Sequence, residues 1–290
     1  MLEVLTLVST LLIPSGIAGP PPAQKALQDI DAFMAKVLEK RDIDWDRFYN
    51  YTCRDHEALE FEGTLQSVAM AGFHREHLYF VRDGYLIRSP ISANGVAISD
   101  EERHRAEQKW VKSLEKREKR SSGVNRDHFF GFKFEPGNYY YAGRRDFEGR
   151  EVVVIEYYPE EGFIDDDDDE EDEDEGEEDE IDAKMNKVFL VTMLVDPKEH
   201  QIVRMTLDNV GFDFLPARWL VQIGTIEASM TMHQPFGDVW LVRDITAYGK
   251  VTTAGGDLAV RYTLEFDDYA IAETSATYRF PPRGADTKKK

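Results

Sequence analysis

The sequence predicts a mainly β (α+β) protein: a curved antiparallel sheet, or half-open barrel, of about ten or eleven strands, with an N-terminal helix and one inserted covering helix. The first observation is a succession of short segments rich in β-branched and aromatic residues, separated by turns that contain Gly, Asn or Asp. The second is that helical spacing of apolar residues occurs in two segments, one before the strands and one among them. The third is the number of strands, because a flat open sheet of ten or eleven strands tends to curl or close.

The first helix is predicted from Ala26 to Arg41, after the break Gly19-Pro20-Pro21-Pro22. Its apolar residues recur at spacings of three and four, which places them on one stripe of a helix. They are Leu27, Ile30, Phe33, Met34, Val37 and Leu38. We expect this stripe to pack on the sheet.

Four strands are expected between the two helices, because the period changes after the first helix and turn signals follow. They are predicted to start at Phe48 and at Gly63, to run from His74 to Val81, and to return from Tyr85 to Arg88. Asp83-Gly84 and Asn94-Gly95 are hairpin turn signals.

The second helix has the clearest start in the chain. Ser99-Asp100-Glu101-Glu102 is a capping box, in which the Ser99 hydroxyl accepts from the Glu102 amide and the Glu102 carboxylate reaches back. The helix should run to about Arg120. Its few apolar anchors are Ala106, Trp110, Val111 and Leu114. We therefore expect it to cover the sheet along a narrow line.

The rest of the chain is predicted to be mostly strands joined by short turns, which favours an antiparallel meander. In the best-patterned segment, Leu258 to Phe266, apolar residues alternate with polar or small ones as in a half-buried strand. The other segments are 128–134, 139–145, 151–158, 187–195, 202–210, 220–232 and 239–248. Turns are expected at 147–149, 196–199 and 255–257.

Residues 1–23 are predicted to be a signal peptide and a Pro-rich break. Leu2 to Ala18 is apolar apart from Glu3 and a few hydroxyls, and it is too short to span a bilayer. The first residues lack the usual Lys or Arg, so either the start is displaced or the signal is weak. The alternative to a leader is a buried N-terminal strand or helix. Export to the periplasm or beyond is the expectation, with one domain over residues 24–284 and a basic tail over 285–290.

The charge of the chain is concentrated in one segment. Of the 18 residues from Asp165 to Asp182, 16 are acidic, and without them the formal net charge of −21 falls to −5. Like charges at this density repel, so the run should be a disordered loop that attracts cations or a basic partner. The densest basic stretch, Arg103 to Arg120, is interleaved with Glu, which argues against nucleic-acid binding.

No recognised catalytic, cofactor or metal motif occurs, so a non-enzymatic role without cofactor is expected. His74 and His77 are three apart on a predicted strand and should point to opposite faces, which argues against a zinc site. The single cysteine, Cys53, cannot form an intramolecular disulfide and is expected to be a small buried apolar residue.

Several segments together resemble one known superfamily. They are the helix Ala26 to Arg41, the strand start Tyr49-Asn50-Tyr51-Thr52, the turn and helix start Asn94 to Glu102, the strand Gly149 to Pro159, and the hairpin Leu194 to Arg204. In these segments the chain resembles the bacterial outer-membrane lipoprotein carriers, the LolA/LolB-like unclosed barrels, and the resemblance covers most of residues 24–280. The resemblance implies acyl chains held in the hollow between sheet and helices, without chemistry. The run Asp165 to Asp182 departs from that pattern.

The sequence therefore favours a periplasmic carrier of a lipid or a lipidated protein. The predicted apolar lining of the hollow consists of Val203, Met205, Tyr262, Leu264 and Phe266, and its predicted rim of Phe212, Phe214 and Trp219. The alternative is a structural or interaction module whose acidic loop contacts a basic partner or cations. A third hypothesis is a hydrolase built from dispersed residues, since a triad is recognised by its geometry.

Overall fold

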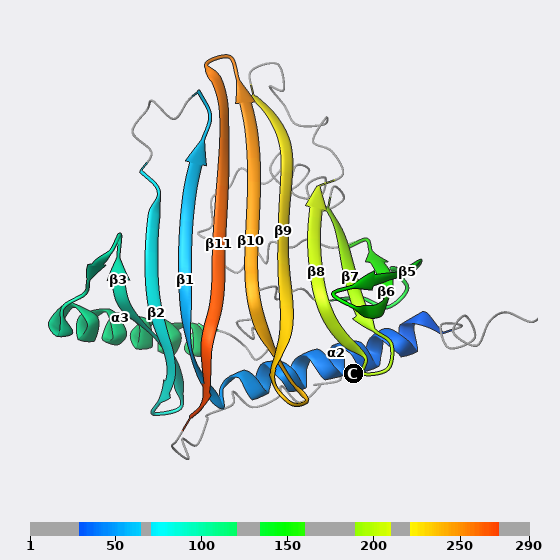
Figure 1. The fold of residues 1–290 in the computed structure, drawn as a ribbon, viewed down its shortest axis with the longest axis horizontal. Coiled ribbons are helices and arrows are strands. Elements are labelled where there is room, and N and C mark those ends of the chain that lie inside the picture. The colour runs from blue at the N-terminus through cyan, green and yellow to red at the C-terminus, as the bar shows by residue number, and fades with distance from the viewer. Residues whose placement is uncertain (1–28, 65–70, 121–133, 160–188, 210–220, 273–290) are drawn as a thin grey trace, which may run out of the picture.

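One antiparallel sheet of 11 strands forms the body of the protein (Figure 1). The computed structural model describes residues 29–64, 71–120, 134–159, 189–209 and 221–272. Across the sheet the strands run in the order β4-β3-β2-β1-β11-β10-β9-β8-β7-β6-β5. The sheet is curved and does not close on itself, so the predicted fold class is confirmed.

The strands are long in the middle of the sheet and short at its β4 edge. Their bounds are β1 Tyr51–Glu62, β2 Phe73–Arg82, β3 Tyr85–Ala93, β4 Val96–Ala97, β5 Tyr139–Phe147, β6 Arg150–Tyr157, β7 Phe189–Asp196, β8 Gln201–Asn209, β9 Val221–Phe236, β10 Val239–Thr253 and β11 Gly256–Ile271. Strands that follow one another in the chain pair in the sheet, apart from β4 and β5. The last strand, β11, returns to pair with β1, and Tyr262 lies opposite Leu59. This one long-range pairing joins the two halves of the meander.

The backbone of two hairpin turns explains why their Asp-Gly and Asn-Gly sequences predict turns. Asp83 and Gly84 have φ of 54° and 85°, and Asn94 and Gly95 have φ of 50° and 76°. Positive φ at both central residues is the type I′ pattern, which matches the twist of paired strands and favours Asn-Gly and Asp-Gly. Both predicted turns are confirmed.

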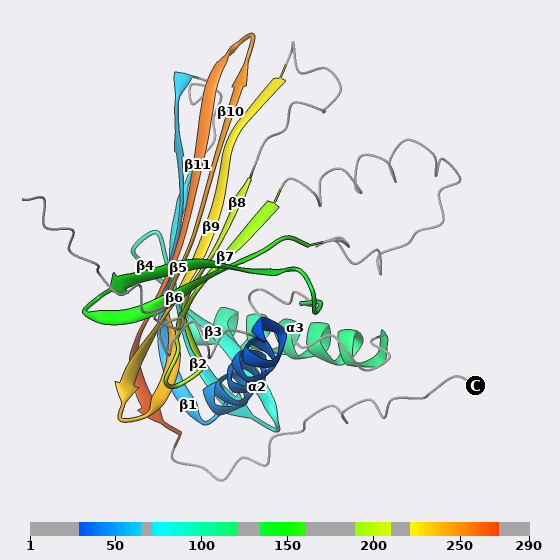
Figure 2. The same ribbon diagram turned by 90° about the vertical axis from the view of Figure 1, so that its right-hand side faces the viewer.

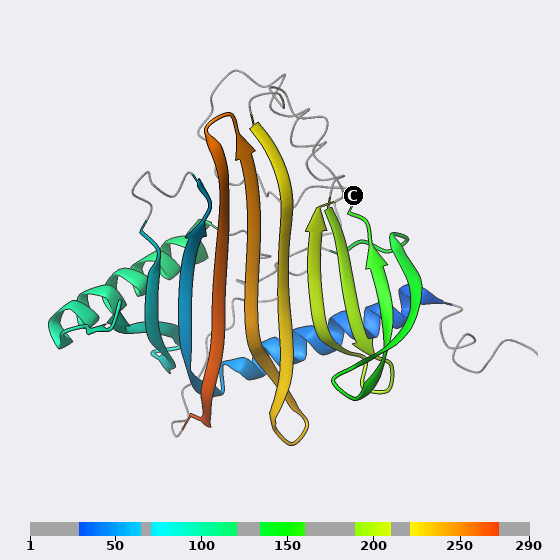
Figure 3. The same ribbon diagram turned by 45° about the horizontal axis from the view of Figure 1, so that its top comes forward.

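Helix α2 (Ile30–Phe48) crosses one face of the sheet, here called the inner face (Figures 2 and 3). The Asp29 side chain caps it by accepting from the Ala32 amide at 3.0 Å. The helix extends past the predicted end at Arg41 to Phe48, so the strand predicted from Phe48 starts later, at Tyr51. Trp45 and Phe48 continue the stripe that faces the sheet, and this packing keeps the segment helical.

No strand starts at Gly63, because β1 runs to Glu62; residues 65–70 lie outside the described ranges. Gly63 follows directly, with φ of 126°, and a Cβ at this position would lie 2.2 Å from the Asp257 carbonyl oxygen. Only glycine fits such a close approach of two backbones. Gly63 therefore ends a strand.

Helix α3 (Asp100–Arg120) starts with the predicted capping box. The Ser99 hydroxyl accepts from the Glu102 amide, and the Glu102 carboxylate accepts from the Ser99 amide, both at 3.3 Å. The helix packs along β3, where the Trp110 indole N–H donates to the Leu86 carbonyl at 2.9 Å. The predicted narrow contact is confirmed.

Several predictions fall outside the described residues. They are the leader 1–23, the strand at 128–133, the acidic run 165–182, the rim residues Phe212, Phe214 and Trp219, and the tail 285–290.

Candidate functional site

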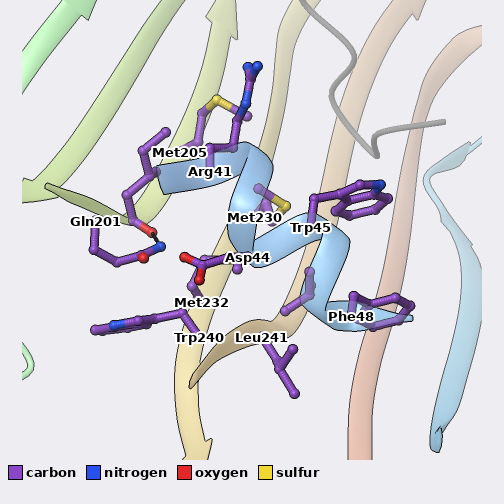
Figure 4. A pocket seen from close by; sticks show the side chains of 12 residues that line it. Arg41, Asp44, Trp45, Phe48, Gln201, Met205, Met230, Met232, Trp240 and Leu241 are labelled. Carbon is purple, nitrogen blue, oxygen red and sulfur yellow. Dashed lines mark hydrogen bonds between the residues drawn. The ribbon is translucent and has the colours of Figure 1, made fainter. Parts of the chain in front are cut away.

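A pocket lies between α2 and strands β8, β9 and β10 (Figure 4). Its residues come from the C-terminal half of α2 and from the inner part of the sheet: Arg41, Asp44, Trp45, Phe48, Gln201, Ile202, Met205, Met230, Met232, Trp240, Leu241 and Val242. The space inside is about 570 Å³ when the part open to solvent is included. Its enclosed part has room for only a few water molecules.

The pocket exists because α2 is held to the sheet at its two ends. At the N-terminal end Phe33, Met34 and Val37 are buried in a cluster with β5 to β8, here called the first cluster. At the C-terminal end Phe48 is buried in a second cluster with β1, β2, β10 and β11. Met230 packs against both clusters. The stretch of α2 between these anchors carries Arg41 to Trp45, and the pocket lies beneath it.

The lining is apolar and adaptable. Three of its residues are methionines, Met205, Met230 and Met232, and two are tryptophans, Trp45 and Trp240. Methionine is unbranched and polarizable, so it fills irregular spaces and repacks around different apolar shapes. A lining of this kind can follow a flexible chain.

The pocket also has polar atoms without partners. Asp44 is 2% exposed; its Oδ1 accepts from Lys40 Nζ at 2.5 Å, and its Oδ2 has no hydrogen bond. Gln201 Oε1 and Arg41 Nη1 are likewise buried and unpaired. Burial raises the pKa of the Asp44 carboxyl, although Lys40 and Arg47 act to lower it. Unpaired buried polar groups cost free energy, so these three atoms need an explanation.

A second group of polar residues, here called the polar cluster, lies on the inner face of β1, β2, β3 and β11. Asp55 Oδ1 is 2.7 Å from His77 Nδ1, and Arg88 Nε donates to Asp55 Oδ2 at 2.7 Å. Arg88 Nη2 lies 3.1 Å from Glu57 Oε2, and the Tyr262 hydroxyl donates to Glu57 Oε1 at 3.0 Å. Asp55 is fully buried, which by itself would raise its pKa; hydrogen bonds from His77 and Arg88 outweigh burial and lower it.

The thiol that borders the polar cluster is not activated. Cys53 is 1% exposed, and burial raises the pKa of its thiol, with the nearby Asp55 charge acting in the same direction. Catalytic cysteines have lowered pKa values and electropositive, partly exposed surroundings. The arrangement around Cys53 is the opposite.

We expect Cys53 to be unreactive toward a soluble thiol reagent such as 5,5′-dithiobis(2-nitrobenzoic acid) in the folded protein at mildly alkaline pH. The thiol should react completely after unfolding in urea, because burial and the raised pKa then disappear. Absorbance of the released thiolate measures the reaction. Stoichiometric modification of the folded protein would contradict this assignment.

The structure separates His74 from His77. His74 is exposed and His77 is buried in the polar cluster, so the two side chains lie on opposite faces of β2, as predicted. Within the described ranges, no group of three or more His, Cys, Asp or Glu side chains is placed to hold a metal ion.

The predicted lining residues fall into three places. Met205 lines the pocket, while Leu264 and Phe266 are buried in the second cluster with half-buried Tyr262 beside them. Val203 is not brought together with Met205; it packs in a separate cluster with Val152, Leu194 and Trp240. A register shift in the β7–β8 pairing, where Leu194 lies opposite Arg204 and Val195 opposite Ile202, leaves Val203 as an extra residue and breaks the alternation.

Sequence reasoning missed the residues that α2 contributes, Asp44 and Trp45, and the polar cluster. A signal for the cluster exists in β1, where Asp55 and Glu57 alternate with polar or small residues at positions that face inward together with Cys53. Carboxylates at two successive inward positions of a strand indicate a partner inside the fold.

The fold and pocket define a class: a single unclosed antiparallel sheet with a helix across its inner face and a small apolar pocket beneath that helix. No protein-family model matches the chain, and no curated protein matches it. Among the described helices, none is long and apolar enough to cross a membrane.

Solved structures with a similar arrangement include the class named by the sequence resemblance. A putative outer membrane lipoprotein-sorting protein domain from Vibrio parahaemolyticus is 11% identical, with a TM-score of 0.28 over 82% of this chain and 92% of that one. A DUF1329 family protein from Desulfovibrio piger is 9% identical, with a TM-score of 0.33 over 86% and 96%. The Pseudomonas aeruginosa MucA/MucB complex matches at 11% identity and a TM-score of 0.22, over 85% and 100%.

Proposed function

We propose that this protein is an exported, non-catalytic carrier that holds an acyl chain between α2 and the inner face of its sheet. The observation that supports this most directly is the methionine- and tryptophan-rich pocket beneath α2. Pockets that bind apolar ligands are lined in this way, with a few polar groups that fix orientation. The apolar leader at the start of the sequence supports the exported setting.

The pocket as it stands is too small for an acyl chain, so α2 has to move. Releasing the N-terminal end would expose Phe33, Met34 and Val37, at about 1.5–3 kcal/mol each. The C-terminal end cannot swing away, because α2 ends at Phe48, β1 starts at Tyr51, and the Ala272 amide donates to the Asn50 carbonyl between them at 2.9 Å. Burying a chain of about fourteen carbons contributes roughly 10 kcal/mol. That gain offsets release of the N-terminal end, so α2 is expected to pivot about its C-terminal end, next to β1.

An apolar path leads on from the pocket along the long strands. On β11 the inward positions Leu264, Tyr262, Val260 and Leu258 lie opposite Ile245, Ala247, Gly249 and Val251 of β10. These strands extend well beyond α2, and no described helix lies over that part of the inner face (Figure 1). An extended chain could follow this stripe.

Native mass spectrometry of the purified protein, followed by solvent extraction, tests the proposal. We expect a co-purified lipid, or uptake of an added single-chain lipid at one equivalent, because the lining is apolar and its polar atoms are few. Absence of any bound or exchangeable lipid in protein that is folded by circular dichroism would contradict the carrier role.

A further inference from the structure

The pocket beneath α2 contains a polar corner that the apolar chain of the proposed function does not use. Two hydrogen-bond acceptors, Asp44 Oδ2 and Gln201 Oε1, are buried there without a partner, and each residue is 2% exposed. The polar ends of these two side chains point toward one another across the pocket (Figure 4). One comes from α2 and the other from the start of β8, so the corner forms where the helix meets the sheet.

We propose that this corner recognises the head of the ligand, and that the head is a neutral group carrying hydroxyls, attached to the acyl chain. This inference rests on the proposed carrier function and names the ligand class of the same site. Two unpaired acceptors require two donors, and a hydroxyl-bearing head supplies them. The chain of the same ligand would occupy the methionine-lined part of the pocket.

The groups around the polar corner disfavour an anionic, a cationic or an apolar head. An anionic carboxylate would face the Asp44 carboxylate and the Gln201 carbonyl oxygen, which offer it no donor. A cationic head would meet positive charge that is already present, because Lys40 Nζ lies 2.5 Å and Arg47 Nη1 3.7 Å from Asp44 Oδ1. An apolar end would leave both acceptors buried and unsatisfied, which is costly. A neutral donor remains.

The end of the pocket at Arg41 is not the site that recognises the head of the ligand. The Arg41 guanidinium is bound through Nε and Nη2 to Asp42 Oδ1, at 3.1 Å and 2.9 Å, and it lies over the Phe134 ring at 5.7 Å. Only its Nη1 is unpaired. Arg41 is therefore a single donor held apart from the corner, while the two acceptors define the head-binding end.

Three probes with the same fourteen-carbon chain test the inference: 1-monomyristoylglycerol, methyl myristate and myristic acid. Binding to the full chain is followed by tryptophan fluorescence, since Trp45 and Trp240 line the pocket, and checked by native mass spectrometry. We expect the glycerol ester to bind about tenfold more tightly than the methyl ester, from two hydrogen bonds that include one to a charged acceptor. Myristate should bind no better than the methyl ester.

Two substitutions locate the preference. Gln201→Met removes one acceptor at constant length, and Asp44→Asn removes the charge; each should reduce the preference for the glycerol ester to about threefold or less while methyl myristate binding is retained. Glu39→Gln is the matched control, because Glu39 is an exposed carboxylate on the same helix. It should leave all three affinities unchanged.

The outcomes separate the two proposals. If none of the probes binds, the carrier function fails. Equal binding of the glycerol and methyl esters by the unmodified chain means that the corner holds only water, and the inference on the head is overturned while the carrier function stands. A preference that survives both substitutions also overturns it, because the head would then be recognised elsewhere.

Discussion

Replacing Arg88 by methionine should lower the free energy of unfolding by about 3–5 kcal/mol at neutral pH, the largest single-residue effect that the structure predicts. Arg88 contacts two buried carboxylates, Asp55 at 2.7 Å and Glu57 at 3.1 Å. Without it the fully buried Asp55 keeps its hydrogen bonds to His77 and Tyr79 but loses the guanidinium, and Glu57 keeps chiefly the Tyr262 hydroxyl. Urea unfolding followed by circular dichroism measures the change.

The pH dependence of this effect has a definite sign. The pKa of Asp55 is lowered in the folded protein, so its stabilisation is present above the ordinary Asp pKa and is lost as the pH falls through the folded value. In Arg88→Met, the guanidinium no longer opposes the burial of Asp55, and protonation of the carboxyl relieves the cost. The difference between the variant and the unmodified protein should therefore narrow as the pH is lowered from 7 toward about 4.

A neighbouring arginine provides the control. The Arg75 side chain is 48% exposed, lies 4.0 Å from Glu57, and stacks on the Phe73 ring at 3.9 Å. Arg75→Met should change the unfolding free energy by less than about 1 kcal/mol, as for other exposed ion pairs. Equal effects of the two substitutions would mean that the polar cluster is not a buried charge network.

The parts of the fold that the sequence predicts well are those that local chemistry determines. Asp-Gly and Asn-Gly turns fix hairpins through φ, Ser99 and Glu102 fix a helix start, and the alternation from Leu258 to Phe266 fixes which side of β11 is buried. Each of these depends on residues a few positions apart. The number of strands was predicted from these local signals, and the curvature of the sheet from the number of strands.

The parts that were missed depend on contacts between distant segments. The helix was predicted to end at Arg41, but it continues to Phe48. Arg41 and Asp44, which interrupt its apolar spacing, line the pocket. Asp55 reaches His77 and Arg88 across 22 and 33 residues, which no local pattern reports. Where a helix stripe or a strand face carries polar residues against its own pattern, a functional or strained site is expected. Both sets of polar residues lie on the inner face of the sheet: Arg41 and Asp44 at the pocket, and Asp55 beside the apolar stripe of β10 and β11.

Holding the N-terminal end of α2 to the sheet should abolish acyl-chain uptake, the largest functional effect that we predict. Asp31 on α2 and Pro136 just before β5 are suitable positions, because the Gly137 amide donates to Asp31 Oδ1 at 2.9 Å and Pro136 is exposed. In an Asp31→Cys/Pro136→Cys variant on a Cys53→Ala background, a short bismaleimide joins the two thiols. Binding of 1-monomyristoylglycerol should fall at least about tenfold on cross-linking, because the pocket then stays at its few-water size.

Single-cysteine variants that carry the same reagent as a monoadduct provide the comparison, since they keep the added mass without the tether. They should bind as the unmodified chain does, and the cross-linked protein should unfold at the same or a higher urea concentration. Undiminished uptake by the tethered protein would show that the chain enters without movement of this end of α2. The site would then be the uncovered inner face of β10 and β11, where Tyr262, Val260 and Leu258 lie opposite Ala247, Gly249 and Val251.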